Sequence, residues 1–289
     1  MTELAGQMNM LQLQVAIFGN IAMLREVTAI RYDREAEVGR TLPLRVGVED
    51  ADGIEHDVIL KLSHGPECGV DTLAKEMLGS LLAGDLGLPI SEAFFVKIEQ
   101  AFIDSLPNNS VRSRLQQSLG IGFGSKNAGR QWRKWEGLDK IPKTNIPLAL
   151  SIIAFDAFCA NFDRRPVNSN MLIKDTEWRL IDHEGAFGFR LLIPPHRPWV
   201  TGSLQNIVNF GQDGEHIFAQ QLVRHDIADY DHVRDRWVGL SDQRFMQYEA
   251  SLPIEWNSVK VEFSGFITHL KEIRDNIDGC IEELRRVLS

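Results

Sequence analysis

The sequence predicts an α+β fold in two lobes, an N-terminal lobe of antiparallel sheet with one helix and a mainly helical C-terminal lobe. The chain has 289 residues, 44% hydrophobic and 25% charged, which is typical of a globular protein with one bilobed or two small domains. Strand-like patterns dominate the first hundred residues, and helical spacings dominate the second half. We place the lobe boundary at residue 125, so that the lobes comprise residues 1–125 and 126–289.

The N-terminal strands are indicated by alternation of apolar residues and by turn signals. Residues 42–62 read as a hairpin that turns at Asp50–Gly53, and residues 71–86 carry leucines at helical spacing up to Gly87 and Pro89. The elements expected here, in chain order, are a strand near 27–32, the hairpin over 42–62, a helix over 71–86, a strand over 93–98 and a helix over 108–119.

Residues 120–125 contain three glycines in five positions, which interrupts regular structure. Two interpretations are open: a connection between the lobes, or a nest of backbone amides that binds phosphate. We favour the connection, because it lies between the N-terminal elements and the long apolar segment that follows.

The second half begins with that apolar segment, residues 146–161, which predicts a helix buried on several sides. A polar loop over 162–170 leads into a second hairpin over 171–181. The last segment, residues 259–288, carries an apolar stripe at spacings of three and four, which predicts a packing helix.

The net charge and the cysteine content limit the cellular compartment and the classes of binding partner that the sequence predicts. The formal net charge of −9 argues against binding to nucleic acid or to an anionic membrane surface. Six basic residues and two tryptophans between residues 126 and 143 could bind nucleic acid, attract ATP or an acidic peptide, or cover apolar surface. Three isolated cysteines, the lack of a basic N-terminal signal and the absence of an apolar run of about 18 residues predict a cytoplasmic protein.

The polar residues that indicate chemistry lie in residues 161–170 and 180–187. Asp163 is followed five residues later by Asn168, and Asp182 follows the second hairpin. Phosphoryl transfer needs a carboxylate that accepts or orients the proton of the nucleophile, and an amide and a carboxylate that hold magnesium on the phosphates. A catalytic loop with this Asp to Asn interval and a separate metal-binding Asp are features of protein kinases.

These motifs resemble those of the HipA-like kinases, a branch of the protein-kinase-like superfamily that is similar to phosphatidylinositol kinases. Residues 161–173, NFDRRPVNSNMLI, are similar to the catalytic loop of that family, and residues 180–187, LIDHEGAF, to its metal-binding segment. Residues 122–125, GFGS, resemble a short motif midway along such chains. The resemblance implies Asp163 as the catalytic base, Asn168 and Asp182 as magnesium ligands, and Asn170 as an accessory residue.

A kinase also needs residues that hold the nucleotide. Lys61 at the end of a strand fits the lysine that contacts the α- and β-phosphates, and Glu76 on the next helix fits its ion-pair partner. The loop that covers the nucleotide should lie around residues 36–41. It contains only Gly39, with Arg40 and Thr41, so a glycine-rich cradle is missing. Phe123, Gly124 and Ser125 are expected to contact the nucleotide from the connection between the lobes.

The predicted function is an ATP- and magnesium-dependent phosphotransferase with an alcohol acceptor, which the resemblance implies is a Ser or Thr of a protein. Alternatives are a nucleotide-binding pseudokinase or regulatory binding module, suggested by the single Gly39, and a small-molecule or lipid head-group kinase. The resemblance also implies a possible regulatory or antitoxin partner. Arg164 and Arg165 either neutralise phosphate or pair with Asp182, or are solvated charges, and we expect a structural hydrogen-bonding role for His183.

Overall fold

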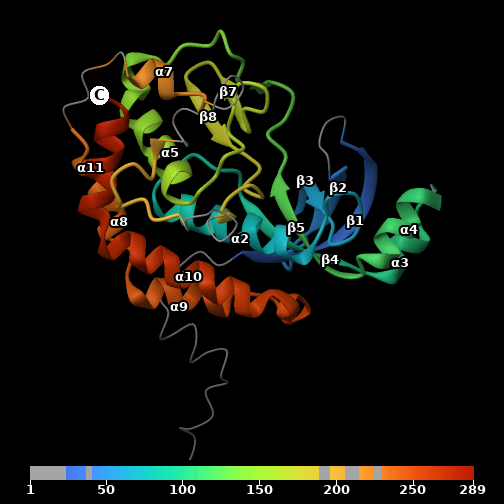
Figure 1. Cartoon of the computed structure of the whole chain (residues 1–289). Helices are drawn as coiled ribbons and strands as arrows, with labels where there is room; N and C mark the ends of the chain where they lie inside the picture. Colours follow the sequence, from blue (N-terminus) through green and yellow to red (C-terminus); the bar gives the residue numbers. More distant parts are fainter. Residues whose placement is uncertain are drawn as a thin grey trace, which may run out of the picture.

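The computed structural model describes residues 24–36, 41–107, 109–188, 196–205, 215–223, 225 and 229–289. Figure 1 shows the strands β1 to β5 together on one side, the helices of the C-terminal half on the other, and α2 between them. The predicted α+β composition is therefore confirmed. No helix within the described ranges is long and apolar enough to cross a membrane.

The five N-terminal strands form a closed barrel in the order β1-β2-β3-β5-β4. Their bounds are Arg25–Glu35 (β1), Leu44–Glu49 (β2), Glu55–Lys61 (β3), Ala93–Ile98 (β4) and Gly120–Lys126 (β5). The first residues of β1 pair with β4 in parallel, while its later residues pair with β2 in antiparallel register. This corrects the expected antiparallel sheet. The β1–β2 register has two irregularities, between Ala29 and Arg31 and between Tyr32 and Arg34, and bulges of this kind increase the local twist of a strand.

The glycine-rich segment is strand β5, paired with β3 and β4, and not the expected connection between lobes. The reason lies in the barrel interior, which is filled by valine, leucine and phenylalanine side chains. A Cβ atom at Gly124 would lie 2.6 Å from methyl groups of both Val58 and Val96. A Cβ at Gly122 would lie 2.8 Å from Leu60 Cδ1. Glycine is required at both positions because the barrel core leaves no room for a side chain.

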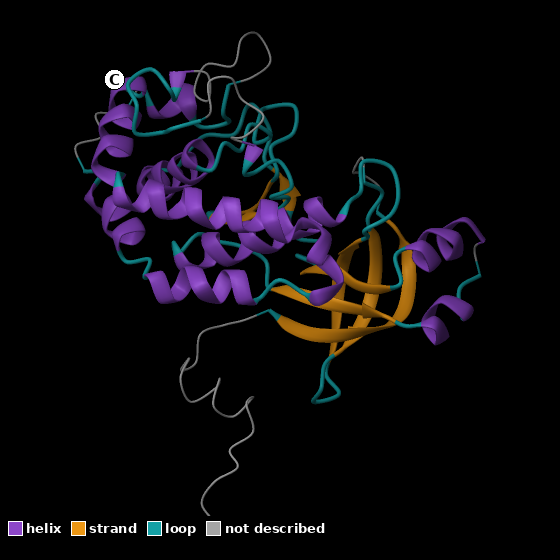
Figure 2. Cartoon of the chain, turned by 60° about the horizontal axis from the view of Figure 1, so that its bottom comes forward, coloured by secondary structure: helices purple, strands orange, loops and turns teal. Residues whose placement is uncertain are grey.

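Helices occupy two sides of the barrel. Helix α2, Val70–Asp85, lies between the barrel and the C-terminal helices, and Leu73, Met77 and Leu78 on it are fully buried. Helices α3, Gln100–Asp104, and α4, Asn109–Gln117, lie at the side of the barrel that faces away from those helices (Figure 2). Helix α4 was expected from the sequence, whereas α3 was not.

The C-terminal half is built around α5, Ile146–Phe158, whose residues from Ile152 to Phe158 are all buried. The predicted second hairpin is present as β7, Met171–Lys174, and β8, Glu177–Leu180, and β6, Arg133–Lys134, adds a third strand. The remaining helices are η1 (Lys143–Asn145), α7 (Ala219–Leu222), α8 (Asp231–Val238), α9 (Asp242–Ala250), η4 (Ile254–Val259), α10 (Lys260–Asp275) and α11 (Ile277–Val287).

The apolar stripe over residues 259–288 belongs to two helices and not to one. Asn276 leaves the helical conformation and serves both as the C-cap of α10 and as the N-cap of α11. Both helices bury their apolar faces in the main core. The packing role was predicted correctly, but the break was not, because spacings of three and four continue across Asn276.

The basic and aromatic residues near β6 do not form an exposed stacking surface. Trp135 is buried, with its ring edge-on to Trp178 and Phe218. Trp132 lies under the guanidinium of Arg179, 4.5 Å from the ring centre. These contacts place both tryptophans against other side chains of the C-terminal half.

Candidate active site

A cavity of about 900 Å³ is lined by the barrel, α2, the β7–β8 hairpin and the two motif segments. Strand β3 ends at Lys61, which lines the cavity. Strand β8 leads directly into the segment that contains Asp182. Residues predicted to act in catalysis or metal binding that line this one cavity are Lys61, Glu76, Asp163, Asn168, Asn170 and Asp182.

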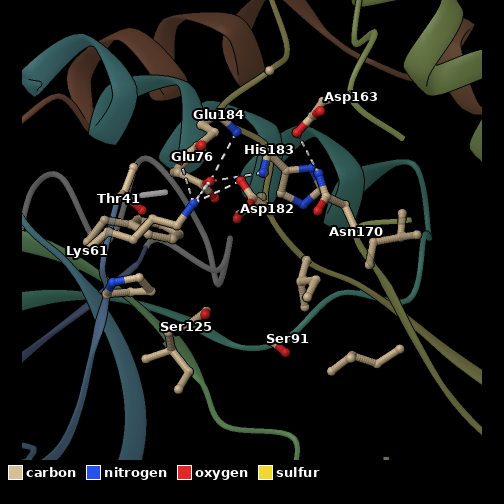
Figure 3. Close-up of a pocket in the computed structure, with 18 of the residues that line it drawn as sticks. Thr41, Lys61, Glu76, Ser91, Ser125, Asp163, Asn170, Asp182, His183 and Glu184 are labelled. Atoms are coloured by element: carbon tan, nitrogen blue, oxygen red, sulfur yellow. Dashed lines mark hydrogen bonds and ion pairs between the residues drawn. The ribbon is translucent and has the colours of Figure 1, made fainter. Parts of the chain in front are cut away.

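The ammonium group of Lys61 lies among three carboxylates (Figure 3). Its Nζ donates to Glu76 Oε1 at 2.6 Å, to Asp182 Oδ1 at 2.9 Å and to Glu184 Oε2 at 2.9 Å. Burial alone would lower the pKa of Lys61, but the three carboxylates raise it above its ordinary value. The lysine is therefore charged at neutral pH and joins β3 and α2 to a segment more than 120 residues away.

Glu76 fixes the metal-binding segment as well as the lysine. Its Oε1 accepts the backbone N–H groups of His183 and Glu184, both at 3.0 Å. Burial raises the pKa of Glu76 to about 7, against the opposing effect of Lys61. For Asp182, burial is outweighed by Lys61, so its pKa lies below the ordinary value. Asp182 also has a φ of 62°, a conformation that is uncommon outside glycine and often marks functional sites.

The loop between α5 and β7 brings Asp163 and Asn168 side by side. Arg165 and Asn168 exchange two backbone hydrogen bonds across a turn that contains Pro166, at 3.0 and 2.9 Å. Asp163 Oδ2 accepts from Asn168 Nδ2 at 2.8 Å and from Asn170 Nδ2 at 3.0 Å. The interval of five residues thus places the Asn168 amide against the Asp163 carboxylate.

The two arginines after Asp163 have different environments. Arg164 is fully buried and pairs with Asp156 on α5, with Nε 2.6 Å from Oδ2, so neither reading from the sequence holds for it. Arg165 lines the cavity, and its Nη2 donates to Asp163 Oδ1 at 3.2 Å. Of these two arginines, Arg165 is therefore the one placed to meet a phosphate in the cavity.

His183 packs in the core behind the site. Its ring lies edge-on to Phe155, and burial lowers its pKa to about 3, so it is neutral at physiological pH. Its Nδ1 is buried and has no hydrogen-bond partner among the described residues. The hydrogen-bonding role expected for the side chain is therefore not found at Nδ1, whereas the backbone N–H is bonded to Glu76.

The residues predicted to hold the nucleotide have mixed positions. Thr41, Phe123 and Ser125 line the cavity. Gly124 is directed into the barrel, where a Cβ atom would meet Val58 and Val96. Gly39 and Arg40 lie outside the described residues.

Glu184 is the site residue that the sequence analysis missed. It supplies the third carboxylate beside Lys61 and lines the cavity. The feature of the sequence that could have identified Glu184 was its position two residues after Asp182. The backbone of this segment is irregular, so several of its polar side chains can face the same cavity. Among the described residues, Glu76, Asp182 and Glu184 offer carboxylate oxygens within 4.8 Å of one another.

The donor groups fit magnesium, which prefers carboxylate and amide oxygens. Because Asn168 uses Nδ2 to bond Asp163, its Oδ1 is left for an ion, and Asp182 lines the same cavity. The fit to a nucleotide rests on the mixed lining: the charged groups gather on one side in Figure 3, and Ser91 and Ser125 lie on the other. Apolar side chains that complete the lining include Ile59, Phe123, Leu172 and Ile181.

Comparisons with known proteins give one family match and one similar structure. A family model described as HipA-like kinase matches residues 59–192. The crystal structure of a Helicobacter pylori proinflammatory kinase, CtkA, is similar with 12% sequence identity and a TM-score of 0.41, over 92% of this chain and 96% of that one. No curated protein sequence gives a significant match. The matched residues 59–192 include Lys61, Glu76, Asp163, Asn168 and Asp182, so the family model covers both motif segments in which the sequence resembles the HipA-like kinases.

Proposed function

We propose that this protein is an ATP- and magnesium-dependent phosphotransferase with a hydroxyl acceptor. The observation that supports this most directly is that Lys61, Asp163 and Asp182 line one cavity, with Lys61 and Asp182 joined by a 2.9 Å ion pair. In this proposal the barrel with α2 and the helical half are the two lobes of a protein-kinase-like fold.

Bound magnesium and ATP would supply the transferable phosphoryl group and neutralise part of its charge. Asp182 and the Oδ1 of Asn168 would hold the metal, and Glu184 is near enough to contribute. Lys61 would turn from Asp182 and Glu184 toward the α- and β-phosphates while keeping its bond to Glu76. Glu76 suits this role because it is buried and fixed by two backbone N–H groups.

Asp163 would hold the proton of the attacking hydroxyl. Its Oδ2 is occupied by the amides of Asn168 and Asn170, whereas among the described residues its Oδ1 accepts one hydrogen bond, from Arg165. We assign Oδ1 as the oxygen that receives the hydroxyl. Arg165 would then shift onto the transferred phosphoryl group, where a cation stabilises the developing charge.

The identity of the hydroxyl acceptor is the most specific part of the proposal. A Ser or Thr of a protein follows from the resemblance to HipA-like kinases, and a regulatory or antitoxin partner follows from the same source. A small-molecule or lipid head-group acceptor uses the same catalytic residues.

The test is ATP turnover and transfer of labelled phosphate, with ATP and magnesium, in the wild type and in Asp163→Asn and Asp182→Asn. Each variant is expected to lose at least 100-fold in kcat. Asp235→Asn is a matched control, because Asp235 is exposed on α8, and it should retain full activity. Full activity in both site variants would refute the assigned roles.

A pseudokinase gives a different result in the same samples. It would be stabilised by ATP in a thermal shift measurement, but neither phosphate transfer nor ADP release would exceed the Asp163→Asn background. Phosphoproteomic comparison of cells that express the wild type or Asp163→Asn identifies a protein acceptor.

A further inference from the structure

We propose that His216 is a positioning residue that holds the catalytic loop, residues 161–170, through a buried network with Asp156 and Arg164. The proposal concerns the active site and rests on the proposed function for its kinetic part. His216 does not line the cavity, so it acts through its partners and not on a substrate.

Asp156 is the centre of the network. It lies on α5 among apolar residues, and its side chain has no exposed surface. Its carboxylate accepts from Asn161 Nδ2 at 2.6 Å, from Arg164 Nε at 2.6 Å and Nη2 at 3.4 Å, and from His216 Nε2 at 2.9 Å. A carboxylate in such a place is stable only when it is paired and fully hydrogen-bonded.

The partners of Asp156 hold the catalytic loop at both ends. Asn161 begins the loop, and its Oδ1 accepts the backbone N–H of Asp163 at 3.3 Å. Arg164 Nη1 donates to the backbone oxygen of Asn170, which ends the loop. The backbone at Asp163 and at Asn170 is thus held by the side chains of Asn161 and Arg164. Both of these side chains are hydrogen-bonded to the Asp156 carboxylate.

His216 reaches this carboxylate from a segment 60 residues further along the chain. Its Nδ1 accepts the backbone N–H of Phe218 at 3.2 Å, so the ring proton is on Nε2 and is donated to Asp156 Oδ2. The backbone N–H of Ile217 donates to Arg164 O at 3.2 Å. The segment is therefore attached to Asp156 by a side-chain hydrogen bond and to the loop itself by a backbone hydrogen bond.

Burial, more than the neighbouring charges, favours a neutral His216 ring. Asp156 and Arg164 are the ionised groups that face it, and the ring of Phe218 lies 5.5 Å away. Burial lowers the pKa of His216 despite the hydrogen bond to Asp156. A neutral donor completes the hydrogen bonding of the carboxylate without unbalancing the ion pair, which a second cation would do.

Two substitutions separate the two hydrogen bonds of the ring. In His216→Gln the amide nitrogen takes the place of Nε2 and can still donate to Asp156. In His216→Asn the amide takes the place of Nδ1, so it can contact Phe218 N–H but does not reach Asp156. His216→Ala removes both contacts, and His232→Ala is the control, because His232 on α8 is half-buried and its ring is bonded to Pro147 O, outside the network around Asp156.

The first measurement is amide hydrogen exchange of the full-length protein, followed for peptides that cover residues 161–170. We expect at least tenfold faster exchange in His216→Asn and His216→Ala, and rates within twofold of wild type in His216→Gln and His232→Ala. Unchanged exchange in the folded His216→Asn variant, or equal effects of Asn and Gln, would overturn the proposal. This result does not depend on activity, so it stands apart from any failure of the proposed function.

The second measurement is steady-state kinetics with ATP. A loop that is less well held misplaces Asp163 but leaves Lys61 and the apolar lining intact, so we expect kcat to fall at least tenfold in His216→Asn with KM for ATP within twofold. His216→Gln should restore most of kcat. A rise in KM with unchanged kcat would contradict the positioning role.

Discussion

The replacement Arg164→Met tests how much stability depends on the buried ion pair beneath the active site. Methionine keeps much of the apolar stem but leaves Asp156 ionised, fully buried and without its cation. It also removes the donor to Asn170 O. Breaking a buried pair in this way costs about 3–5 kcal/mol, a large part of the roughly 5–15 kcal/mol that stabilises a typical protein.

The pH dependence follows from the same groups. In the wild type, burial would raise the pKa of Asp156, but Arg164 and His216 lower it from 3.8 to about 2. This difference corresponds to about 2 kcal/mol of stability, present above pH 3.8 and lost as pH falls through 2. In the variant, burial dominates and the pKa rises above its ordinary value, so Asp156 takes up a proton on acidification. The deficit relative to wild type should therefore be largest at pH 7 and smaller at pH 4.

Urea denaturation followed by tryptophan fluorescence at both pH values measures the deficit. Arg133→Met is the matched control, since Arg133 forms a comparable pair with Asp139 but is 56% exposed, and it should cost about 1 kcal/mol or less. A loss below 1 kcal/mol for Arg164→Met at pH 7, or a deficit that grows on acidification, would refute the reasoning.

Three further predictions concern the barrel and the site. Gly124→Ala should destabilise the protein by about 1–3 kcal/mol, because its Cβ would lie 2.6 Å from two valine methyl groups, whereas Gly137→Ala, with no atom within 4 Å, should be neutral. Glu184→Gln should raise the melting temperature of the ATP-free protein, because Lys61 keeps two carboxylates while repulsion within the cluster falls. Because burial lowers the pKa of His183 from 6.5 to about 3, the wild type should lose about 2–3 kcal/mol between pH 6.5 and 4.5, and His183→Asn should reduce that loss.

Each of these predictions has an outcome that contradicts it. Equal stability of Gly124→Ala and Gly137→Ala would show that the barrel adapts to the extra methyl group. A lower melting temperature for Glu184→Gln would mean that the third carboxylate stabilises Lys61 more than it repels its neighbours. The same acid slope in His183→Asn as in the wild type would assign the titration to other groups.

Local patterns in the sequence were sufficient for most elements and for the composition of the site. Strand β4 and the β7–β8 hairpin lie over the residue ranges predicted for them, because side-chain period and turn residues act over a few positions. The loop that contains Asp163 and Asn168 could also be predicted from the sequence. A short turn between Arg165 and Asn168 fixes how these two side chains lie relative to each other. The same reasoning failed at β5, because a glycine required by the barrel interior looks the same in sequence as a glycine in a loop.

The sequence by itself determined which residue types are available: a lysine at a strand end, a glutamate on the next helix, and the Asp and Asn motifs. Tertiary structure alone decided which charges meet. It placed Glu184 beside Lys61, buried Arg164 against Asp156 and left Arg165 at the cavity. The physical reason is that the strength of a charge pair depends on distance and burial, and both are set by how the segments of the whole chain pack together.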